Sequence, residues 1–474
     1  MTTSTFPPTN PASLFDFAPC SAQDALAAAS ETKALAIGRG CIGEVAAVFK
    51  RQFPGKTAVI VADENTMRVA GNTVLELLAA AGVPLLAPFV YHDPALYAEY
   101  KFVEQLVASL KNHDAIPVAV GSGCVNDLAK RASHETGRQY FCVATAASMD
   151  GYTAFGASIT YEGAKQTLTC PAPQAVLADI DIIKNAPADM TASGYADLLA
   201  KIPAGADWLV ADALGEEPVD LKAWAIVQGG LRSALARPAD AREGEPTAIH
   251  ELTEGLMLGG FAIQWAKSSR PASGAEHQFS HLWDMEHHEH NGVAPSHGFK
   301  VGVGTHAVTA FYEQLLGMSA DALDIDAVAA RWPDAETVEA RTAAMFAHSG
   351  FGEAAVRETK AKYIAAPALR LQLARLKREW PALCAKLRRQ LLPLAEVRQR
   401  LQAVGAPVDP EQIGISRERL RDSFLKAYHI RRRFTVLDLA TRTGWLAPCL
   451  DRLFGPGGMW EIKNAPKNST QGNS

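Results

Sequence analysis

The sequence predicts an α/β domain with a parallel sheet, followed by an all-helical domain. Up to about residue 185, short and almost continuously apolar runs alternate with helical patterns; the strand pattern then fades, and the rest is Ala- and Leu-rich with helical periodicity. Strands without polar alternation are typical of a parallel sheet that helices cover on both faces. At about 100–200 residues per domain, the 474 residues suit two or three domains.

The strands expected in the first domain are apolar runs between helical patterns. They cover residues 56–63 (KTAVIVAD), 84–90, 116–123 (IPVAVGSG), 139–148 and 174–183, with helices over 65–81, over 97–112 and from about Asn126. We place this domain at residues 31–185, after an arm (1–30) whose first part is rich in Pro, Thr and Ser and is expected to be irregular.

The second domain is expected over residues 186–460. Its clearest helix carries apolar residues at steps of three and four from Leu369 to Leu394, which marks one face over about seven turns. Pro381 is expected either to begin a second helix or to kink the first. The polar segment 461–474 is expected to be a flexible tail.

Composition narrows the range of partners. The formal net charge is −5, so there is no bulk electrostatic reason to bind nucleic acid. No apolar run reaches the length of about 18 residues that a membrane span needs, and the first residues do not resemble a signal peptide. Seven scattered cysteines without a CxxC pair favour a reducing cytoplasm over a zinc ribbon or a secreted location.

A glycine-rich turn follows the strand that begins at Ile116. Such a turn between strand and helix points backbone N–H groups at one place and allows a pyrophosphate to approach closely. The third glycine of the usual dinucleotide pattern is missing, and a tight turn without a ligand is the alternative. The candidate cofactor residues lie in this turn or where neighbouring strands end: Asp63, Gly121, Ser122, Gly123, Asp127, Thr145 and Ser148.

Histidines concentrate between residues 277 and 306. His277 and His281 are four residues apart and would share a helix face, and His297 opens the next segment. Neutral imidazoles suit Zn²⁺ and Ni²⁺, and a catalytic site needs a third protein ligand. Asp197, an acid in an apolar helical stretch, is that candidate, because a buried carboxylate is costly unless it is paired or metal-bound. Pairing with Lys201, four residues later, is the alternative.

Other polar residues of the region have simpler interpretations. Asp150 follows a strand end, where it could orient a substrate hydroxyl or only cap the turn before Gly151. His287, His288 and His290 lie among glutamates before an Asn-Gly turn and are expected at the surface.

Four stretches together resemble the superfamily of iron-containing alcohol dehydrogenases and dehydroquinate synthases. They are GSGCVNDLAK (121–130), VATAASMDG (143–151), ASGYADLLAKIPAGADW (192–208), and SSRPASGAEHQFSHLWDME with SHGFKVGVG (268–286 and 296–304). The resemblance covers roughly residues 30–445 and is closest to the dehydrogenases of sn-glycerol 1-phosphate. Two departures are Ala154, where relatives often carry serine near the nicotinamide ribose, and the His/Glu-rich segment 282–296, expected only to lengthen a loop.

The resemblance implies a Rossmann-like domain and a helical domain of the dehydroquinate synthase type, with a cleft between them. It assigns Asp197, His277 and His297 to one divalent metal ion, zinc or nickel, and NAD(P)H to the candidate cofactor residues. It makes Asp150 and His281 catalytic residues on the substrate side, with Asp197 also beside the substrate.

The implied reaction is reduction of dihydroxyacetone phosphate to sn-glycerol 1-phosphate, a lipid precursor. A metal would polarise the ketone, and the reduced nicotinamide would supply hydride. Ser269 and Arg270 are the expected phosphate partners, with Lys201 as a further candidate. The carboxylate of Asp63 favours NADH over NADPH, although dual use stays open. The apolar surface of the long C-terminal helices is the basis for an expected homodimer.

Three alternatives remain at this stage. A glycerol or polyol dehydrogenase would share the metal site without a phosphate pocket, and a dehydroquinate synthase-like enzyme would recycle its NAD. A protein of another class, which binds lipid surfaces without catalysis, is suggested by the basic residues between 370 and 400 and by Arg431, Arg432 and Arg433.

Overall fold

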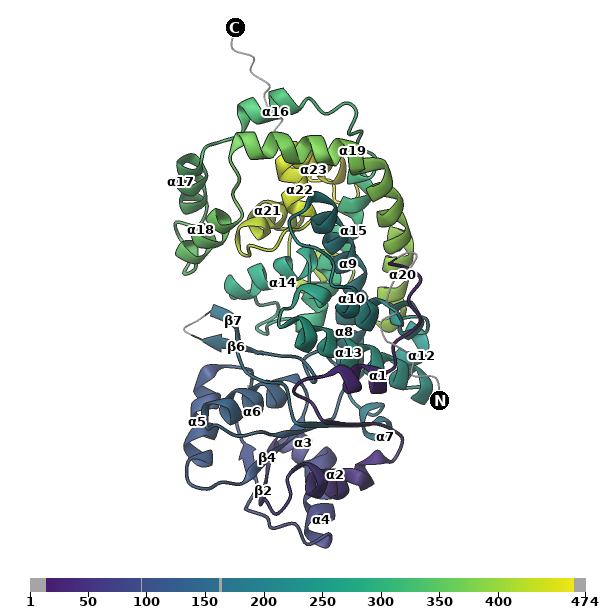
Figure 1. Ribbon diagram of the computed structural model, residues 1–474. Coiled ribbons are helices and arrows are strands. Elements are labelled where there is room, and N and C mark those ends of the chain that lie inside the picture. The colour runs from purple at the N-terminus through teal and green to yellow at the C-terminus, as the bar shows by residue number, and fades with distance from the viewer. Residues whose placement is uncertain (1–13, 95, 162–163, 464–474) are drawn as a thin grey trace.

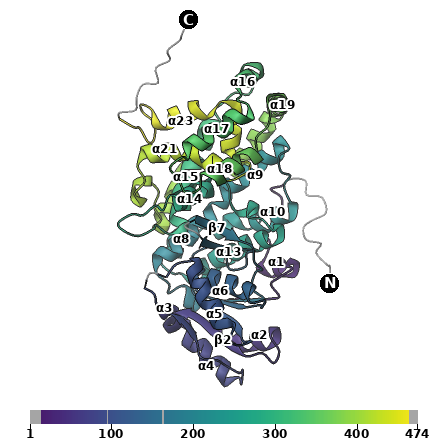
Figure 2. The same cartoon turned by 90° about the vertical axis from the view of Figure 1, so that its left-hand side faces the viewer.

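The computed structural model describes residues 14–463 except 95 and 162–163. The chain forms two halves, a sheet-containing half that lies below in Figure 1 and a helical half above it, and Figure 2 shows the same stacking from the side. The predicted order, an α/β domain followed by a helical domain, is therefore the observed order. The exact domain limits given above stay a prediction, and most of the expected flexible tail lies outside the described residues.

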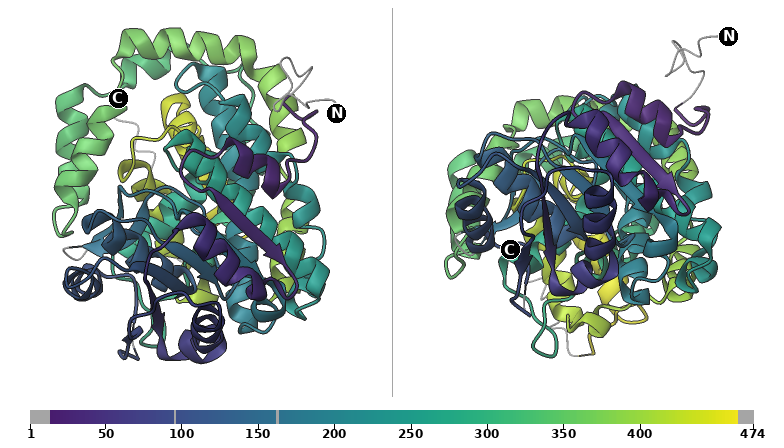
Figure 3. Two further views of the ribbon diagram at one scale, coloured as in Figure 1. Left: turned by 60° about the horizontal axis from the view of Figure 1, so that its bottom comes forward. Right: turned by 90° about the horizontal axis from the view of Figure 1, so that it is seen from below.

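The main sheet is entirely parallel. Its strands follow the spatial order β1-β8-β5-β4-β2-β3. Their bounds are β1 Ala34–Gly38, β2 Ala58–Asp63, β3 Phe89–Tyr91, β4 Ile116–Gly121, β5 Phe141–Ala144 and β8 Ala175–Asp179. Figure 3 shows the edge strand β1 in purple, seen from below, beside helices of the second half.

Helices cover both faces of this sheet, as the apolar strands predict. One face packs on α2 (Val45–Gln52) and α4 (Asn72–Ala80), and the other on α5 (Tyr100–Leu110) and α6 (Gly123–Glu135). Alternate strand residues pack on opposite faces. Ile60 lies in the core with α2 and α4, and Val59 lies in the core with α5 and α6. Both are buried, because successive side chains of a strand point to opposite faces.

The strand order reverses between β2 and β4. From β2 the chain continues outward to β3, then returns to β4 on the other side of β2. In open α/β sheets, ligands bind beyond the carboxyl ends of the strands at such a reversal. Asp63 ends β2 and Gly121 ends β4, so these candidate residues flank that position.

Two local expectations about the first half are wrong, and a hairpin was not expected. The run 84–90 is mostly irregular, because only Phe89–Tyr91 pairs as a strand and Leu85 forms an isolated bridge. Residues 180–183, expected to continue a strand, form helix α7 (Ile180–Ile183), which Asp179 caps. An antiparallel hairpin of β6 (Ala157–Tyr161) and β7 (Ala164–Leu168) lies outside the main sheet and was not predicted.

The helical half begins at α8. Its helices are α8 Ala188–Leu199, α9 Lys201–Leu214, α10 Leu221–Gln228, α11 Leu231–Ala234, α12 Pro238–Arg242, α13 Pro246–Ala266, α14 Ala275–Met285, α15 His297–Leu315, α16 Ile325–Arg331, α17 Ala335–Met345, α18 Gly352–Ala361, α19 Ala366–Gln390, α20 Leu394–Val404, α21 Arg417–Lys426, α22 Val436–Thr443 and α23 Leu446–Phe454. Short helical turns complete the described chain: α3 Glu64–Thr66, Cys41–Glu44, Met67–Gly71, Arg270–Ala272, Pro410–Ile413 and Ala427–His429.

Helix α19 carries the predicted apolar stripe. Leu369, Leu376 and Leu387 are fully buried on this face, whereas Leu371, on the opposite face, is exposed. The helix runs through Pro381 to Gln390, so this proline neither begins a second helix nor ends the first.

The segment before β1 packs on the helical half. The Trp224 indole N–H donates to the Leu14 carbonyl over 2.7 Å, and helix α1 (Ala22–Ala28) begins where the Ala22 amide donates to Glu254 over 2.9 Å. The chain then enters β1 at the sheet edge. The described part of the expected arm is thus not wholly irregular; residues 1–13 lie outside the described chain.

Candidate active site

A cleft of about 1060 Å³ opens between the two halves. The sheet-containing half lines it with the glycine-rich turn, the segment 148–151 and the hairpin; the helical half contributes α14, the start of α15 and residues 431–433. This volume exceeds that of a typical site for a drug-sized ligand and suits a dinucleotide together with a small substrate.

The glycine-rich turn joins β4 directly to α6. Ser122 precedes the first turn of α6, and both Ser122 and Gly123 line the cleft, so the free N–H groups of this helix end face it. A Cβ at Gly121 would stand 2.5 Å from the Cβ of Val125, and one at Gly123 would stand 3.0 Å from Met149. Packing therefore requires glycine at position 121, whereas a side chain at position 123 would have to displace the flexible Met149 side chain.

The other cofactor candidates fall into two groups. Ser148 and Asp127 line the cleft, and the Asp127 carboxylate accepts from the Ser158 amide over 3.1 Å. Asp63 and Thr145 lie at the same sheet edge behind the lining: Asp63 caps α3 by accepting from the Thr66 amide, and the Thr145 amide donates to Gly121. Cys124 lines the cleft, and burial raises the pKa of its thiol; the negative charge of Asp63 contributes to this rise.

Asp197, His277 and His297 converge from three helices. Each offers one ligand atom, and all three atoms lie within 4.8 Å of one another. The His277 Nε2 atom is 3.4 Å from Asp197 Oδ1, close to the roughly 3.3–3.4 Å expected between two tetrahedral ligands of one zinc ion. One carboxylate and two imidazoles, all with little exposure, form a donor set that fits Zn²⁺ or Ni²⁺.

A neighbouring carboxylate prepares His277 for metal binding, and burial prepares His297. The His277 Nδ1 atom is 2.8 Å from the buried Glu276 carboxylate, which leaves Nε2 to face Asp197. Such a carboxylate fixes the ring and its tautomer. Burial lowers the pKa of His297 to about 3, although the charge of Asp197 opposes this. His297 is therefore neutral near pH 7, as a metal ligand must be.

The two expected substrate-side residues flank this set. The His281 ring lies 6.2 Å from those of both His277 and His297, and its buried Nδ1 has no partner among the described residues. Burial, and next the charge of Arg431, lowers the pKa of His281 well below its usual range. Asp150 lines the cleft, and its backbone N–H donates to Asp197 over 3.1 Å.

Lys201 is fully buried behind these carboxylates. Its ammonium lies 2.6 Å from Asp197 Oδ1 and 2.7 Å from Asp150 Oδ2. Burial opposes ionisation of Asp197, but the charge of Lys201 and the hydrogen bond from His277 hold its pKa well below the usual range. Lys201 does not line the cleft, so it is not placed to bind a substrate phosphate.

Close packing fixes the loop that carries Ser148 and Asp150. A Cβ at Gly194 of α8 would stand 1.9 Å from the Ala147 carbonyl oxygen and 3.1 Å from the Ser148 Cα. Backbone atoms cannot turn aside as a flexible side chain can, so any larger residue at 194 must displace this loop.

We therefore expect Gly194→Ala to lower both stability and activity. Overpacking of a tight interior costs about 1–3 kcal/mol. Urea unfolding should show this loss, and steady-state kinetics should show a lower kcat, because Ser148 and Asp150 move. Gly43→Ala is the control, because nothing lies within 4 Å of a Cβ at that position. Equal stability and kcat in the two variants would contradict the packing argument.

Arg270 does not occupy the predicted phosphate-binding position. Its guanidinium is buried away from the cleft lining and donates to the Phe434 and Asp207 carbonyls over 2.8 and 3.0 Å. Its Nε lies 3.2 Å from the Glu217 carboxylate, so the guanidinium charge is paired within the helical half. Ser269, the other candidate, does line the cleft and accepts from Arg433 over 2.7 Å.

Three cations of the cleft were missed as substrate residues. Arg431, Arg433 and Lys165 all line it. Among the described residues, no hydrogen bond or ion pair engages the head group of Arg431 or Lys165, while Arg433 donates to the Ser273 carbonyl and to Ser269. Burial and the charges of Arg270 and Arg431 lower the pKa of Arg433 to about 9. This part of the cleft therefore has positive charge that lacks a counter-ion.

The segment 282–296 does more than lengthen a loop. Its first part completes α14, and its last residues, 293–296, line the cleft beside His290. The prediction that His288 is a surface residue is wrong: its ring is buried between the Ile413 carbonyl at 2.6 Å and Arg419 at 2.7 Å. His287 is exposed, as predicted.

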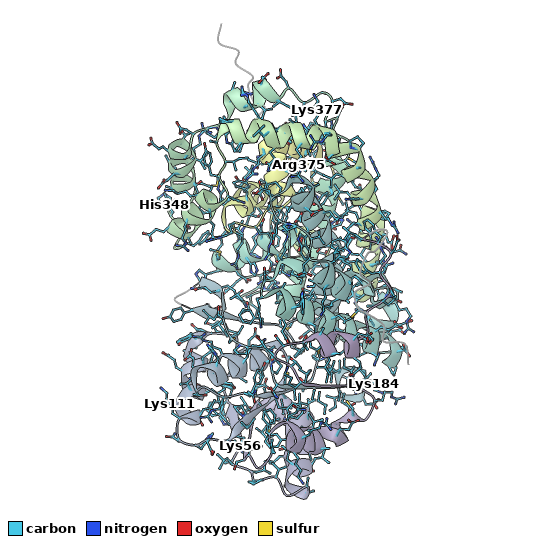
Figure 4. The ribbon with its side chains drawn as sticks, in the orientation of Figure 1. Lys56, Lys111, Lys184, His348, Arg375 and Lys377 are labelled. Carbon is cyan, nitrogen blue, oxygen red and sulfur yellow. The ribbon has the colours of Figure 1, made fainter. Side chains whose placement is uncertain are left out.

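Several basic residues of α19 contact the protein itself. Arg388 and Arg375 of α19 each donate to a backbone carbonyl of the protein body, and Arg389 pairs with Asp16. Figure 4 shows labelled cations at distant places, with Lys56 on the sheet-containing half and Lys377 at the other end. Within the described residues, no helix combines the length and apolar character needed to cross a membrane.

The chain is similar to known proteins along much of its length. A family model described as iron-containing alcohol dehydrogenase matches residues 36–187. A glycerol-1-phosphate dehydrogenase [NAD(P)+] of Halalkalibacterium halodurans is 35% identical over 54% of this chain, which spans 64% of that relative, just under two thirds. Enzymes of the same name from Methanosphaera stadtmanae (33% identical, 56% of this chain, 74% of that one) and Bacillus licheniformis (27%, 89% and 92%) also match.

Solved structures show the fold. A glycerol dehydrogenase from Schizosaccharomyces pombe superposes with a TM-score of 0.55 at 13% identity, over 89% of this chain and 91% of that one. An NADH-dependent butanol dehydrogenase from Thermotoga maritima gives 0.54 at 16% identity, over 87% and 96%. The predicted dehydroquinate synthase-like fold class is thus confirmed. The chain belongs to the glycerol-1-phosphate dehydrogenase family within the iron-containing alcohol dehydrogenases, a family of oxidoreductases.

Proposed function

We propose that this protein reduces dihydroxyacetone phosphate to sn-glycerol 1-phosphate with NAD(P)H and one divalent metal ion, zinc or nickel. The relatives named as glycerol-1-phosphate dehydrogenases support this activity. One structural observation carries it for this chain: a single cleft is lined by the glycine-rich turn, by the two imidazoles of the metal-type ligand set, with Asp197 directly behind them, and by the cations Arg431, Arg433 and Lys165.

Three groups of residues would bind the metal ion, the dinucleotide and the substrate phosphate. Asp197, His277 and His297 would hold the metal ion, and Ser122, Gly123 and Asp127 would line the dinucleotide. When bound, these groups would supply a Lewis acid for the ketone oxygen and a hydride for its carbon. Arg431, Arg433 and Lys165 would bind the phosphate, since guanidinium and ammonium groups are strong partners for its oxygens.

Asp150 and His281 would act on the substrate itself. Both line the cleft next to the ligand set. Asp150 is positioned to accept a hydrogen bond from the free hydroxyl of the substrate, which would fix one face of the planar ketone. The unpartnered Nδ1 of His281 gives it a place in a chain that brings a proton to the new alkoxide.

The test is to follow NADH and NADPH oxidation with dihydroxyacetone phosphate by absorbance, before and after chelation. We expect activity that is lost on chelation, returns with Zn²⁺ or Ni²⁺, and yields only the sn-1 product in a chiral assay. Asp63 should favour NADH, because its carboxylate would repel a 2′-phosphate.

Dihydroxyacetone without phosphate is the matched comparison. Equal kcat/KM for the two ketones would favour the polyol dehydrogenase alternative, which needs no phosphate partners. Full activity in the chelated protein, verified by metal analysis, would contradict the metal assignment.

A further inference from the structure

We propose that Lys201 is a built-in counter-cation that opposes binding of a divalent metal ion at Asp197 while it holds Asp197 and Asp150 together in the metal-free protein. This rests on the metal assignment in the proposed function. Lys201 touches neither the cleft nor a substrate, so it is a positioning residue.

The geometry of the three groups carries this inference. Lys201 Nζ lies 2.6 Å from Asp197 Oδ1 and 2.7 Å from Asp150 Oδ2, and the lysine and Asp197 side chains are fully buried. Besides the Lys201 contact, Asp197 Oδ1 lies 3.4 Å from the His277 imidazole. The ammonium therefore shares an oxygen atom with the ligand set itself.

Asp197 and Asp150 each lie within 2.7 Å of the same ammonium, so the two carboxylates repel each other and the charge of Lys201 offsets this repulsion. In the metal-free protein this charge cancels one of the two negative charges. A divalent ion then meets a net charge of −1 rather than −2 from these three groups. The lysine thus weakens metal binding, and it leaves the loaded group at +1 rather than 0, which favours negative charge on a substrate oxygen.

The test uses the full-length protein after chelation and compares wild type with Lys201→Met, which keeps most of the side-chain length but removes the charge. Competition against a chromophoric chelator gives the affinity for Zn²⁺ and, separately, for Ni²⁺. We expect Lys201→Met to bind each ion at least tenfold more tightly. We also expect a lower Tm for its metal-free form and a larger rise in Tm on metal addition than in wild type.

Asp150→Asn/Lys201→Met keeps the test decisive if the single variant folds poorly. Removing both partners restores a group with one negative charge, so its metal affinity and metal-free Tm should return toward wild-type values. Lys362→Met is the matched control. This other buried lysine pairs with Asp438 over 2.9 Å outside the cleft lining, so its loss should lower Tm without changing metal affinity.

Unchanged or weaker metal binding in folded Lys201→Met would overturn the inference and leave Lys201 only a support for the Asp197 side chain. Failure of wild type to bind either ion would instead refute the metal assignment. The two failures are therefore distinguishable.

Discussion

Asp197→Asn should lose its metal ion and nearly all of its activity together. The substitution preserves the shape of the side chain but replaces an anionic ligand by a neutral amide, which binds Zn²⁺ and Ni²⁺ poorly. Without the Lewis acid, kcat/KM should fall by about 10³-fold or more, which corresponds to about 4 kcal/mol of transition-state stabilisation. Metal analysis of the purified protein and steady-state kinetics with dihydroxyacetone phosphate check the two losses separately.

Asp438→Asn is the control for the loss of a buried carboxylate. Asp438 is also fully buried and pairs with a lysine, but it is not one of the three metal-type ligands Asp197, His277 and His297. Its variant should be less stable yet keep its metal and most of its kcat. Metal retained at wild-type stoichiometry in Asp197→Asn would remove Asp197 from the ligand set.

Arg431→Met should impair use of the phosphorylated ketone specifically. The Arg431 head group lines the cleft without a hydrogen bond or ion pair to other described residues. A hydrogen bond to a charged group contributes about 1.5–3 kcal/mol, so kcat/KM for dihydroxyacetone phosphate should fall about 10- to 150-fold, mostly through a higher KM. The rate with unphosphorylated dihydroxyacetone should stay unchanged.

The neighbouring Arg432 offers a matched control. Its guanidinium forms two hydrogen bonds with Glu358, at 2.9 and 2.8 Å, so it is less free to bind a phosphate. Arg432→Met should change the KM much less than Arg431→Met. A similar fall in the two variants, or a fall with both ketones, would contradict a phosphate-specific role for Arg431.

Sequence patterns predicted those parts of the fold that local periodicity determines. The buried strands and the stripe on α19 are examples, because a run of apolar side chains needs cover on every exposed face. The hairpin β6–β7 was missed because its strands include polar residues such as Lys165 and Thr167. Likewise, Pro381 lies inside α19 and does not begin a second helix, because the apolar stripe on both sides of it packs against the protein body. The kink expected at this proline stays a prediction.

In the candidate site, too, some features follow from the local sequence and others only from the tertiary structure. Residue type and spacing single out Asp197, His277, His281 and His297 as a group, and the family resemblance then implies that His281 is not a ligand. Partners of cations depend instead on tertiary structure. Arg270 and Arg431 are alike as residue types, yet the first is engaged by carbonyls of the helical half and the second lines the cleft. The triple-arginine run was the available signal for the second, but its position beside the histidines could not be seen from the chain.

The segment before β1, residues 14–30, packs on the helical half and thereby affects how the two halves can move relative to each other. The polypeptide passes between the halves twice, once where this segment enters β1 and again between β8 and α8. Gln264 of α13 fastens the first passage by accepting from the Glu31 amide and donating to the Thr153 carbonyl, over 3.0 and 2.9 Å. Any change in the relative position of the two halves must therefore be accommodated at both passages.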